Sequence, residues 1–433
     1  MSGPQMSETP VRLAAHVRQR ASVVPPALAL AKPLDMLLCG ALAVLGFVLL
    51  FSVAGVSLML AVLAVLALAA APAVWRSAPW REPVIAVGLI LLAYIAVHTV
   101  WTSGFTSAAW QGINRYHELM MAPVLLALFR IVSGKRLFFQ GLICGALAYA
   151  AAHWTGTFWP QLARYLEPRH ISAGFGLALC AYVLLEQARH SPRPWPSRIA
   201  ALFLAVTVLF AVGGRTGHLV LLLLVACAAW LHSPRRWRWA MVVVVPLVVL
   251  VMGLGSNAVQ KRMADTLSGS QQGLDGTLSS TGIRIELLRT GLDLVGIHFL
   301  AGAGFARYAQ VHEQSALARY GSDPERRVLL KAQWSRTTNP HNEYLMQLVG
   351  GGVAALALFL AWLTLPMLRA GRRSGVRASL VGIALAFALG CLFNSLLMDF
   401  VEGHVYVALL AWLLAQAADA PANAPANAST IGA

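Results

Sequence analysis

The feature that most constrains this chain is a series of long apolar runs separated by short polar links. A helix needs about 20 mostly apolar residues to cross the hydrocarbon core of a bilayer. Runs of about this length fall at residues 36–54, 56–74, 84–103, 117–134, 137–155, 173–188, 199–214, 217–232, 240–256, 343–368, 378–398 and 404–418. They are too continuously apolar for the alternation that is typical of a membrane β-barrel. We therefore expect an all-α polytopic membrane protein with about 12 transmembrane helices.

The Lys and Arg residues are distributed unevenly between the polar links. The N-terminal segment and every second link after it hold 19 of the 33 basic residues. The short links between them hold only Arg115, Arg164, Arg169 and Arg215. Because cytoplasmic loops carry an excess of Lys and Arg, the first set is predicted to be cytoplasmic, with both termini inside. The net charge of +16 is thus explained by orientation in a membrane, and we expect no nucleic acid as a partner.

The polar segments divide the chain into five parts. We expect a cytoplasmic N-terminal segment at residues 1–35, transmembrane helices 1–9 at 36–256, an outer loop at 257–341, transmembrane helices 10–12 at 342–418, and a disordered cytoplasmic tail at 419–433. The N-terminal segment has too long a polar lead for a cleavable signal peptide. The tail repeats Pro-Ala-Asn and shows no apolar pattern.

The spacing of apolar residues in the outer loop predicts helical structure. It holds 10 basic and 7 acidic residues, and long loops are usually functional or disordered. Within it, residues 280–296 place Ile283, Leu287, Thr290 and Leu294 on one face of a helix. We expect helices that lie across the outer membrane–water boundary rather than a separate domain.

Two arginines on the outer side are candidates for binding an anion. Arg215 lies in the motif GGRTGH at a junction between runs, where ionisable residues are costly and often functional; alternatively, it extends to the interface. Arg284 lies in the first turn of the loop helix, where a cation opposes the helix dipole unless an anion binds there. Its alternative role is that of a solvated surface residue. Arg289 ranks lower because it can pair with Glu286 or Asp293.

One histidine has the position of a catalytic base. His341 lies in the motif NPHNEY, where the loop re-enters the membrane, and Asn342 and Glu343 are near enough to orient its imidazole. Histidine is the natural general base near neutral pH, although a lone histidine at a helix start is more often structural. Arg115 and His117 are secondary candidates that could line the same cavity.

Several motifs are absent from the sequence. There is no Walker A motif, no GxGxxG fingerprint and no HExxH motif. The five cysteines lie in separate apolar runs without metal-ligand spacing, and no paired outer carboxylates of a divalent-cation site are apparent. We therefore expect no cofactor and no metal.

Three signatures occur in a fixed order: GGRTGHL, then SSTGIRIELLRTGLDLVGIHFLAGAGFARY, then PHNEYLMQLVGGGVAALALF. Together they resemble the O-antigen ligase and O-antigen polymerase superfamily of bacterial envelope glycosyltransferases. The resemblance extends over residues 200–420, whereas the first five apolar runs match only in hydropathy.

The resemblance implies a membrane glycosyltransferase of the GT-C type that works without a metal. It implies a glycan donor linked to undecaprenyl pyrophosphate at the periplasmic face of the bacterial inner membrane. Carried over by motif, Arg215 and Arg284 would bind the donor pyrophosphate and His341 would be the base. The implied partners are the undecaprenyl-pyrophosphate-linked O-antigen, a lipid A–core acceptor and the surrounding lipids.

Three functions remain open at this point. Within the superfamily, a chain of this length with one dominant outer loop resembles the O-antigen ligase most, whereas an O-antigen polymerase would use the same donor with a glycan acceptor. A lipid-linked sugar transporter would show internal repeats and charges within its spans. No repeat is evident, and the ionisable residues cluster at one face, with Glu186 near the inner end of the run 173–188 as the exception. These features favour an enzyme over a transporter.

Overall fold

The computed structural model describes residues 30–159, 161, 170–212, 214–254, 260, 280–319, 336–369 and 376–419. The expected N-terminal segment up to residue 29, much of the outer loop and the tail from residue 420 lie outside the described residues. The described parts of the chain consist of helices, turns and connecting segments without strands, which confirms the all-α class.

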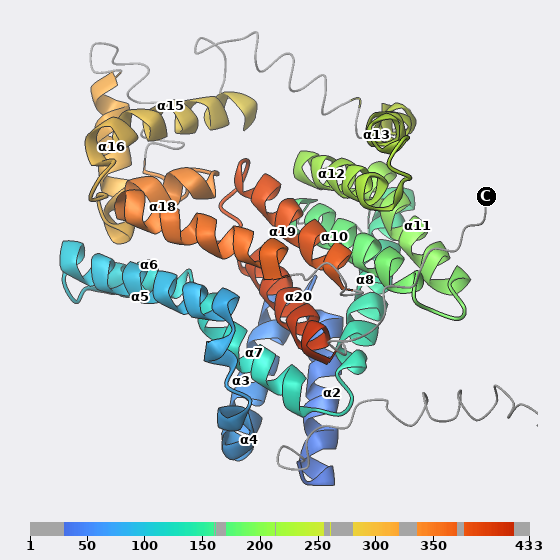
Figure 1. The fold of residues 1–433 in the computed structure, drawn as a ribbon. Helices are drawn as coiled ribbons and strands as arrows, with labels where there is room; N and C mark the ends of the chain where they lie inside the picture. The colour runs from blue at the N-terminus through green and yellow to red at the C-terminus, as the bar shows by residue number, and fades with distance from the viewer. Residues whose placement is uncertain are drawn as a thin grey trace, which may run out of the picture.

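Each predicted apolar run overlaps a helix, although several helices are shorter than the run (Figure 1). In chain order these helices are α2 (Lys32–Val48), α3 (Val53–Ala69), α5 (Pro83–Ser103), α7 (Glu118–Ile131), α8 (Arg136–Phe158), α10 (His170–Ala188), α11 (Trp195–Phe210), α12 (Arg215–His232), α13 (Arg238–Leu254), α18 (Glu343–Arg369), α19 (Arg377–Cys391) and α20 (Phe400–Asp419). Shorter helices are α4 (Ala71–Arg76), α6 (Ser107–Asn114), α15 (Ser280–His298) and α16 (Tyr308–Arg319).

The number of complete spans is smaller than the number of apolar runs. Among the described residues, six helices are long and apolar enough to cross a membrane: α5, α8, α10, α12, α18 and α20. A seventh span results if the bent pair of α3 with the segment after it is counted as one, whereas α11, α13 and α19 are apolar but shorter. The structure thus supports a polytopic membrane protein and does not confirm twelve full spans.

The predicted run 56–74 is not one helix. α3 ends at Ala69, and the chain turns by 87° into the following helical segment. Pro72 lies in the first turn of α4. Since proline has no main-chain N–H, the hydrogen-bond ladder of α3 cannot continue through it. Apolar composition alone could not show this bend.

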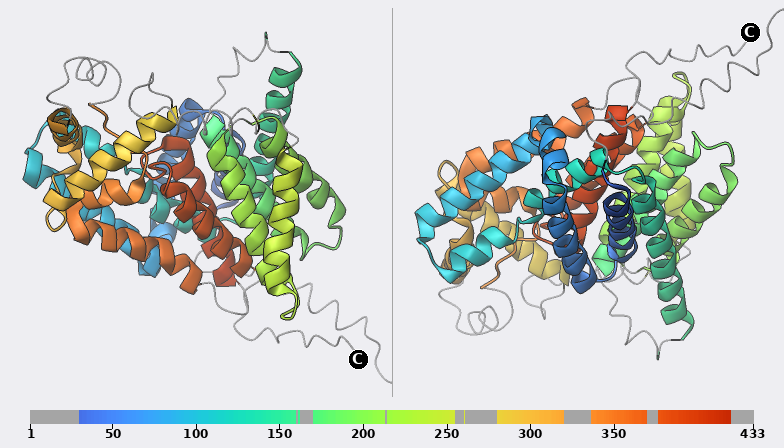
Figure 2. Two further views of the ribbon diagram at one scale, coloured as in Figure 1. Left: turned by 90° about the horizontal axis from the view of Figure 1, so that it is seen from above. Right: turned by 90° about the horizontal axis from the view of Figure 1, so that it is seen from below.

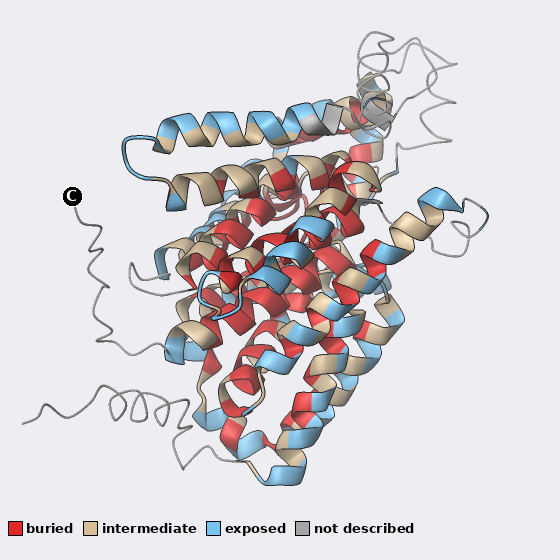
Figure 3. Cartoon of the chain, turned by 90° about the vertical axis from the view of Figure 1, so that its right-hand side faces the viewer, coloured by how far each residue is buried: buried red, intermediate tan, exposed pale blue. Residues whose placement is uncertain are grey.

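Two helices form the centre of the bundle. α10 and α20 are mostly buried, whereas α5, α8 and α12 are buried over about a third of their apolar windows. α20 lies between the group of α5, α6 and α18 and the group of α10 to α13 (Figures 1 and 2). The outer helices expose wide faces, as Figure 3 shows, and Trp101 and Leu68 are 86% and 76% exposed. Such apolar exposure is expected where lipid is the solvent.

The helix predicted in the outer loop is present as α15. It packs on α18 and on α16, and it lies across the top of the bundle in Figure 1. Of the predicted stripe, Leu287, Thr290 and Leu294 are buried. The hydrophobic spacing therefore identified the packed face of this helix correctly.

α18 is kinked where the segment after α15 docks on it. Gly352 has φ of +70°, a left-handed conformation that interrupts the helix. The main-chain N–H of Ala303 donates to the carbonyl oxygen of Val349 at 2.7 Å, and that of Gly304 donates to Gly350 at 2.9 Å. These bonds satisfy carbonyls that the kink leaves without a partner in the helix. The predicted run 343–368 is therefore not a straight span.

Residues predicted to share the cytoplasmic side contact one another. Glu82 pairs with Arg130 at 3.5 Å and with Arg369 at 3.0 Å, joining the start of α5 to the ends of α7 and α18. Lys135, just before α8, pairs with Asp419 at the end of α20. The grouping agrees with the alternation of charged links, although the compartment that this side faces stays a prediction.

Candidate functional site

The three residues singled out in the sequence lie close together in space. Arg215 begins α12, Arg284 lies in the first turns of α15, and His341 stands just before α18. Burial lowers the pKa of Arg284, and the charge of Arg215 lowers it further. Burial also lowers the pKa of His341, with a second contribution from the charge of Arg284. Each residue is thus within electrostatic reach of the next.

A buried asparagine connects two of the segments that meet here. Arg284 donates from Nη2 to the Oδ1 atom of Asn394 at 3.4 Å. Asn394 in turn donates from Nδ2 to the hydroxyl of Thr216 at 2.9 Å. Asn394 is fully buried, and Thr216 directly follows Arg215 at the start of α12. The amide therefore positions the start of α15 against the start of α12.

Asn394 was missed because it lies in a run that was predicted as a continuous helix. α19 ends at Cys391, and the segment 392–399 forms turns before α20 begins. The signal was present in the sequence, since Asn394 and Ser395 interrupt an apolar stretch with two adjacent polar residues. Such residues compete with helical hydrogen bonds and favour turns.

His341 has an unusual main-chain conformation. Its φ is +51°, in the left-handed region that few residues other than glycine adopt. Its main-chain N–H donates to the Oδ1 atom of Asn339 at 2.7 Å, which stabilises this turn. Strain of this kind often persists at functional sites, where the surrounding structure enforces it.

The imidazole of His341 is available for proton transfer. Its Nδ1 atom is enclosed and has no hydrogen-bond partner among the described residues. Because its pKa is lowered from the ordinary value of 6.5, the ring is neutral near pH 7 and carries a lone pair.

The two residues after His341 do not orient its ring, contrary to our expectation. Asn342 accepts from the main-chain N–H of Leu345 at 3.0 Å, which caps α18, and donates to the carbonyl of Leu392 at 3.0 Å. Glu343 is fully buried and accepts from Gln347 at 2.8 Å. Asn342 satisfies one of the first N–H groups of α18, which have no partner within the helix. Glu343 also accepts from the main-chain N–H of Leu397 at 3.2 Å.

The secondary candidates have separate places. The guanidinium of Arg115 donates to the main-chain oxygen of Thr338 at 3.0 Å and to its hydroxyl at 2.9 Å. Arg115 therefore holds the segment that leads into His341. Arg289 pairs with Glu286 at 2.9 Å and is 53% exposed, so the predicted ion pair on this helix is confirmed. His117 lies apart from these contacts, at the start of α7.

Carboxylates from separate segments lie near one another in the fold, among them Glu343, two residues after His341. Asp399 lies near Glu402 and Glu343, and burial followed by these two charges raises the pKa of Asp399 to about 8. The charge of Arg115 opposes the shift. Glu118 is also fully buried and lies near Glu343. The sequence showed no paired outer carboxylates because these residues come from three distant segments and become neighbours only in the fold.

The comparison with known families supports the resemblance seen in the motifs. The O-antigen ligase family matches residues 200–360, a segment that contains Arg215, Arg284 and His341. No curated protein matches the chain. Residues 200–360 of the chain are therefore similar to the O-antigen ligase family.

Proposed function

We propose that the protein is an O-antigen ligase that transfers a polysaccharide from undecaprenyl pyrophosphate to lipid A–core. The proposed reaction takes place at the periplasmic face of the bacterial inner membrane, with both termini cytoplasmic and a GT-C-type arrangement of helices. The observation that carries the proposal is the convergence of Arg215, Arg284 and His341 from three segments that are far apart in the sequence.

The two arginines have the properties of a pyrophosphate site. Arg215 and Arg284 are near enough that one lowers the pKa of the other, and the hydrogen-bond partner of Arg284 is the neutral amide of Asn394. Two neighbouring cations repel each other in a partly dry site, and an anion bound between them relieves that repulsion. A guanidinium also binds phosphate oxygens in a bidentate way, which sets the direction of the ligand.

His341 is proposed as the general base. The hydroxyl oxygen of the acceptor sugar attacks the anomeric carbon of the donor while its proton moves to the neutral imidazole. The bond from the anomeric carbon to the pyrophosphate oxygen breaks, and its electron pair leaves with undecaprenyl pyrophosphate. Direct displacement of this kind inverts the anomeric centre. The arginines neutralise the leaving anion, so this step needs neither an acidic group on the leaving oxygen nor a metal.

Donor binding and base strength are linked in this arrangement. In the free protein the charge of Arg284 lowers the pKa of His341. A bound pyrophosphate compensates that charge, so the pKa of His341 rises and the ring becomes a better proton acceptor. The base is therefore strengthened when the donor is in place.

The test is reconstitution of the purified full-length protein in liposomes with an undecaprenyl-pyrophosphate glycan and lipid A–core. We expect glycan on lipid A–core, and its loss with His341→Ala, which should still bind the donor. Longer glycan on the carrier would assign a polymerase instead. Movement of the donor across the bilayer without a new glycosidic bond would assign a transporter.

A further inference from the structure

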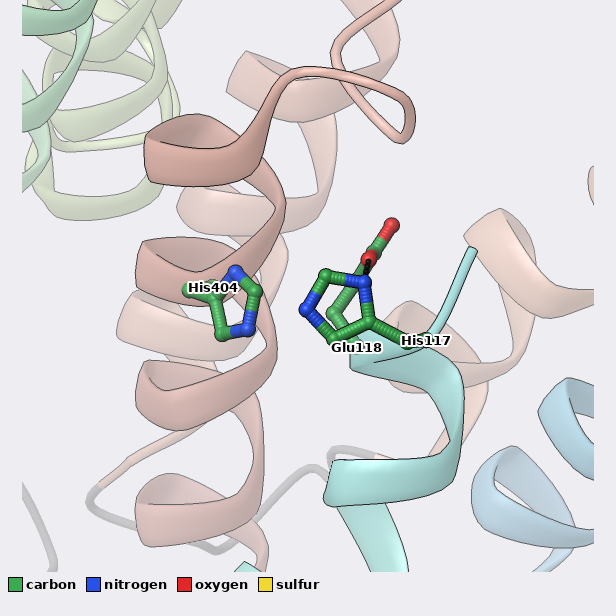
Figure 4. A group of neighbouring side chains, drawn as sticks. All are labelled: His117, Glu118 and His404. Atoms are coloured by element: carbon green, nitrogen blue, oxygen red, sulfur yellow. Dashed lines mark ion pairs between the residues drawn. The ribbon is translucent and has the colours of Figure 1, made fainter. Parts of the chain in front are cut away.

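A second cluster of chemically active side chains lies at the start of α7 and α20. His117 directly precedes α7, Glu118 is the first residue of α7, and His404 lies one turn into α20. Each side chain offers one potential ligand atom, and the three atoms lie within 4.8 Å of one another. Figure 4 shows the two imidazole rings facing each other, with the carboxyl group of Glu118 behind His117.

The hydrogen bonds of the two histidines determine which nitrogen is free. The Nδ1 atom of His117 lies 2.7 Å from the carbonyl oxygen of Asn114, and that of His404 lies 2.6 Å from the carbonyl oxygen of Phe400. A carbonyl oxygen only accepts, so each Nδ1 carries the proton. Each Nε2 therefore presents a lone pair. A metal-binding histidine typically donates its other N–H to a carbonyl or carboxylate in this way.

Two atoms of the cluster are buried without the partners that such atoms need. The exposed fraction is 2% for His404 and 1% for Glu118, so both residues are almost completely buried. The Nε2 atom of His404 and the Oε1 atom of Glu118 have no hydrogen-bond partner among the described residues. Buried polar atoms are normally satisfied, and a buried carboxylate is costly without a compensating charge.

We propose that His117, Glu118 and His404 form a binding site for a Zn²⁺ ion. Two imidazole nitrogens and one carboxylate oxygen match the preference of Zn²⁺, with a water molecule as the fourth ligand. The side chains would draw in to ligand distances of about 2.0–2.2 Å. The ion would compensate the charge of Glu118, accept the lone pairs of the two Nε2 atoms and join α7 to α20.

The three ligands are different residues from those of the proposed arginine site, and the Zn²⁺ site does not depend on the proposed transfer. The sequence predicts no metal site here, because a metal-ligand motif can be recognised in a sequence only when its ligands lie in one short segment. His117 and Glu118 are adjacent in the sequence, but His404 reaches them only through the packing of α20 on α7.

The experiment uses the purified full-length protein in detergent, equilibrated with Zn²⁺ and then freed of unbound ion. Elemental analysis and titration calorimetry should find one tightly bound Zn²⁺ per chain, and Zn²⁺ should raise the Tm. His404→Ala and Glu118→Gln should each weaken Zn²⁺ binding by more than about 10-fold, the loss that even an outer-shell partner causes. His298→Ala removes a histidine at the end of α15, outside the cluster, and should bind Zn²⁺ as the wild type does.

Glu118→Gln keeps the size of the side chain, so it tests the site even if His404→Ala does not fold. Failure of the wild-type protein to bind Zn²⁺ would overturn the proposal. Equal binding by the wild type and by a monodisperse Glu118→Gln variant would overturn it as well.

Discussion

The guanidinium of Arg115 donates two hydrogen bonds to Thr338, one from Nη1 to the main-chain oxygen at 3.0 Å and one from Nη2 to the hydroxyl at 2.9 Å. This contact joins the segment before α7 to the segment that leads into His341. Arg115 would therefore position the proposed base through this segment rather than by touching the ring. A positioning role of this kind separates it from the two arginines proposed to bind the donor.

We predict that Arg115→Ala lowers kcat by about 10- to 100-fold, because a displaced catalytic group loses rate steeply with distance. The donor KM should change little. Arg307→Ala, which removes an exposed outer cation elsewhere, is the matched control. A similar loss in both variants would indicate a general charge effect and contradict positioning by Arg115.

The pH dependence of transfer should reflect His341. Its pKa lies below the ordinary value of 6.5, so kcat/KM should rise with pH through an inflection below that value as the ring becomes neutral. Arg284→Gln removes the nearby cation, which should raise the pKa and move the inflection to higher pH. Arg289→Gln changes a paired arginine on the same helix and should leave the inflection in place. If Arg284→Gln leaves the inflection in place, the charge of Arg284 does not set the pKa of the group that controls transfer.

The arginines of the proposed donor site should be needed for use of the donor. Loss of a hydrogen bond to a charged group costs about 1.5–3 kcal/mol. We therefore predict that Arg215→Ala or Arg284→Ala lowers kcat/KM for the donor by about 10- to 150-fold. Lysine at either position should restore only part of the loss, since it lacks the planar fork. Arg289→Ala is the control, and unchanged donor kinetics in either test variant would remove that residue from the site.

Transfer should withstand chelation. If Arg215 and Arg284 supply the positive charge for the leaving group, as proposed, EDTA should not change the initial rate at a temperature well below unfolding. The same treatment should lower the Tm if Zn²⁺ joins α7 to α20. Inhibition that Mg²⁺ or Mn²⁺ reverses would count against leaving-group neutralisation by arginine alone, without bearing on the Zn²⁺ site.

The kink of α18 should be sensitive to a single methyl group. Gly352 has φ of +70°, and a Cβ atom there would lie 2.2 Å from the carbonyl oxygen of Leu300. Left-handed strain alone costs about 1–3 kcal/mol, so Gly352→Ala should lower the Tm of the full chain by several degrees. At Gly40 in α2, a Cβ atom would meet nothing within 4 Å. Gly40→Ala should therefore leave the Tm unchanged or raise it, and equal effects at both positions would argue against the kink.

Much of the candidate site was predictable because its signals are local. Arg215 and Arg284 were noticeable as cations at helix starts on the side poor in positive charge, and His341 was noticeable beside a proline at a helix entry. The ion pair of Arg289 with Glu286 follows from helical spacing alone. Asn394 was not identified, since its role depends on a turn within an apparently continuous apolar run.

The sequence by itself determined that the chain is helical, that its runs are apolar enough for a membrane, and which residues are candidates for the site. Hydropathy and helix spacing are properties of neighbouring residues, so they can be read without the fold. The tertiary structure decided which apolar runs form long helices, where α18 kinks, and which side chains meet. Arg215, Arg284 and His341 lie within reach of one another only through the packing of α12, α15 and α18, and the same holds for Glu118 and His404 across α7 and α20. Contacts between distant segments depend on how whole helices pack, and no local pattern in the chain encodes that packing.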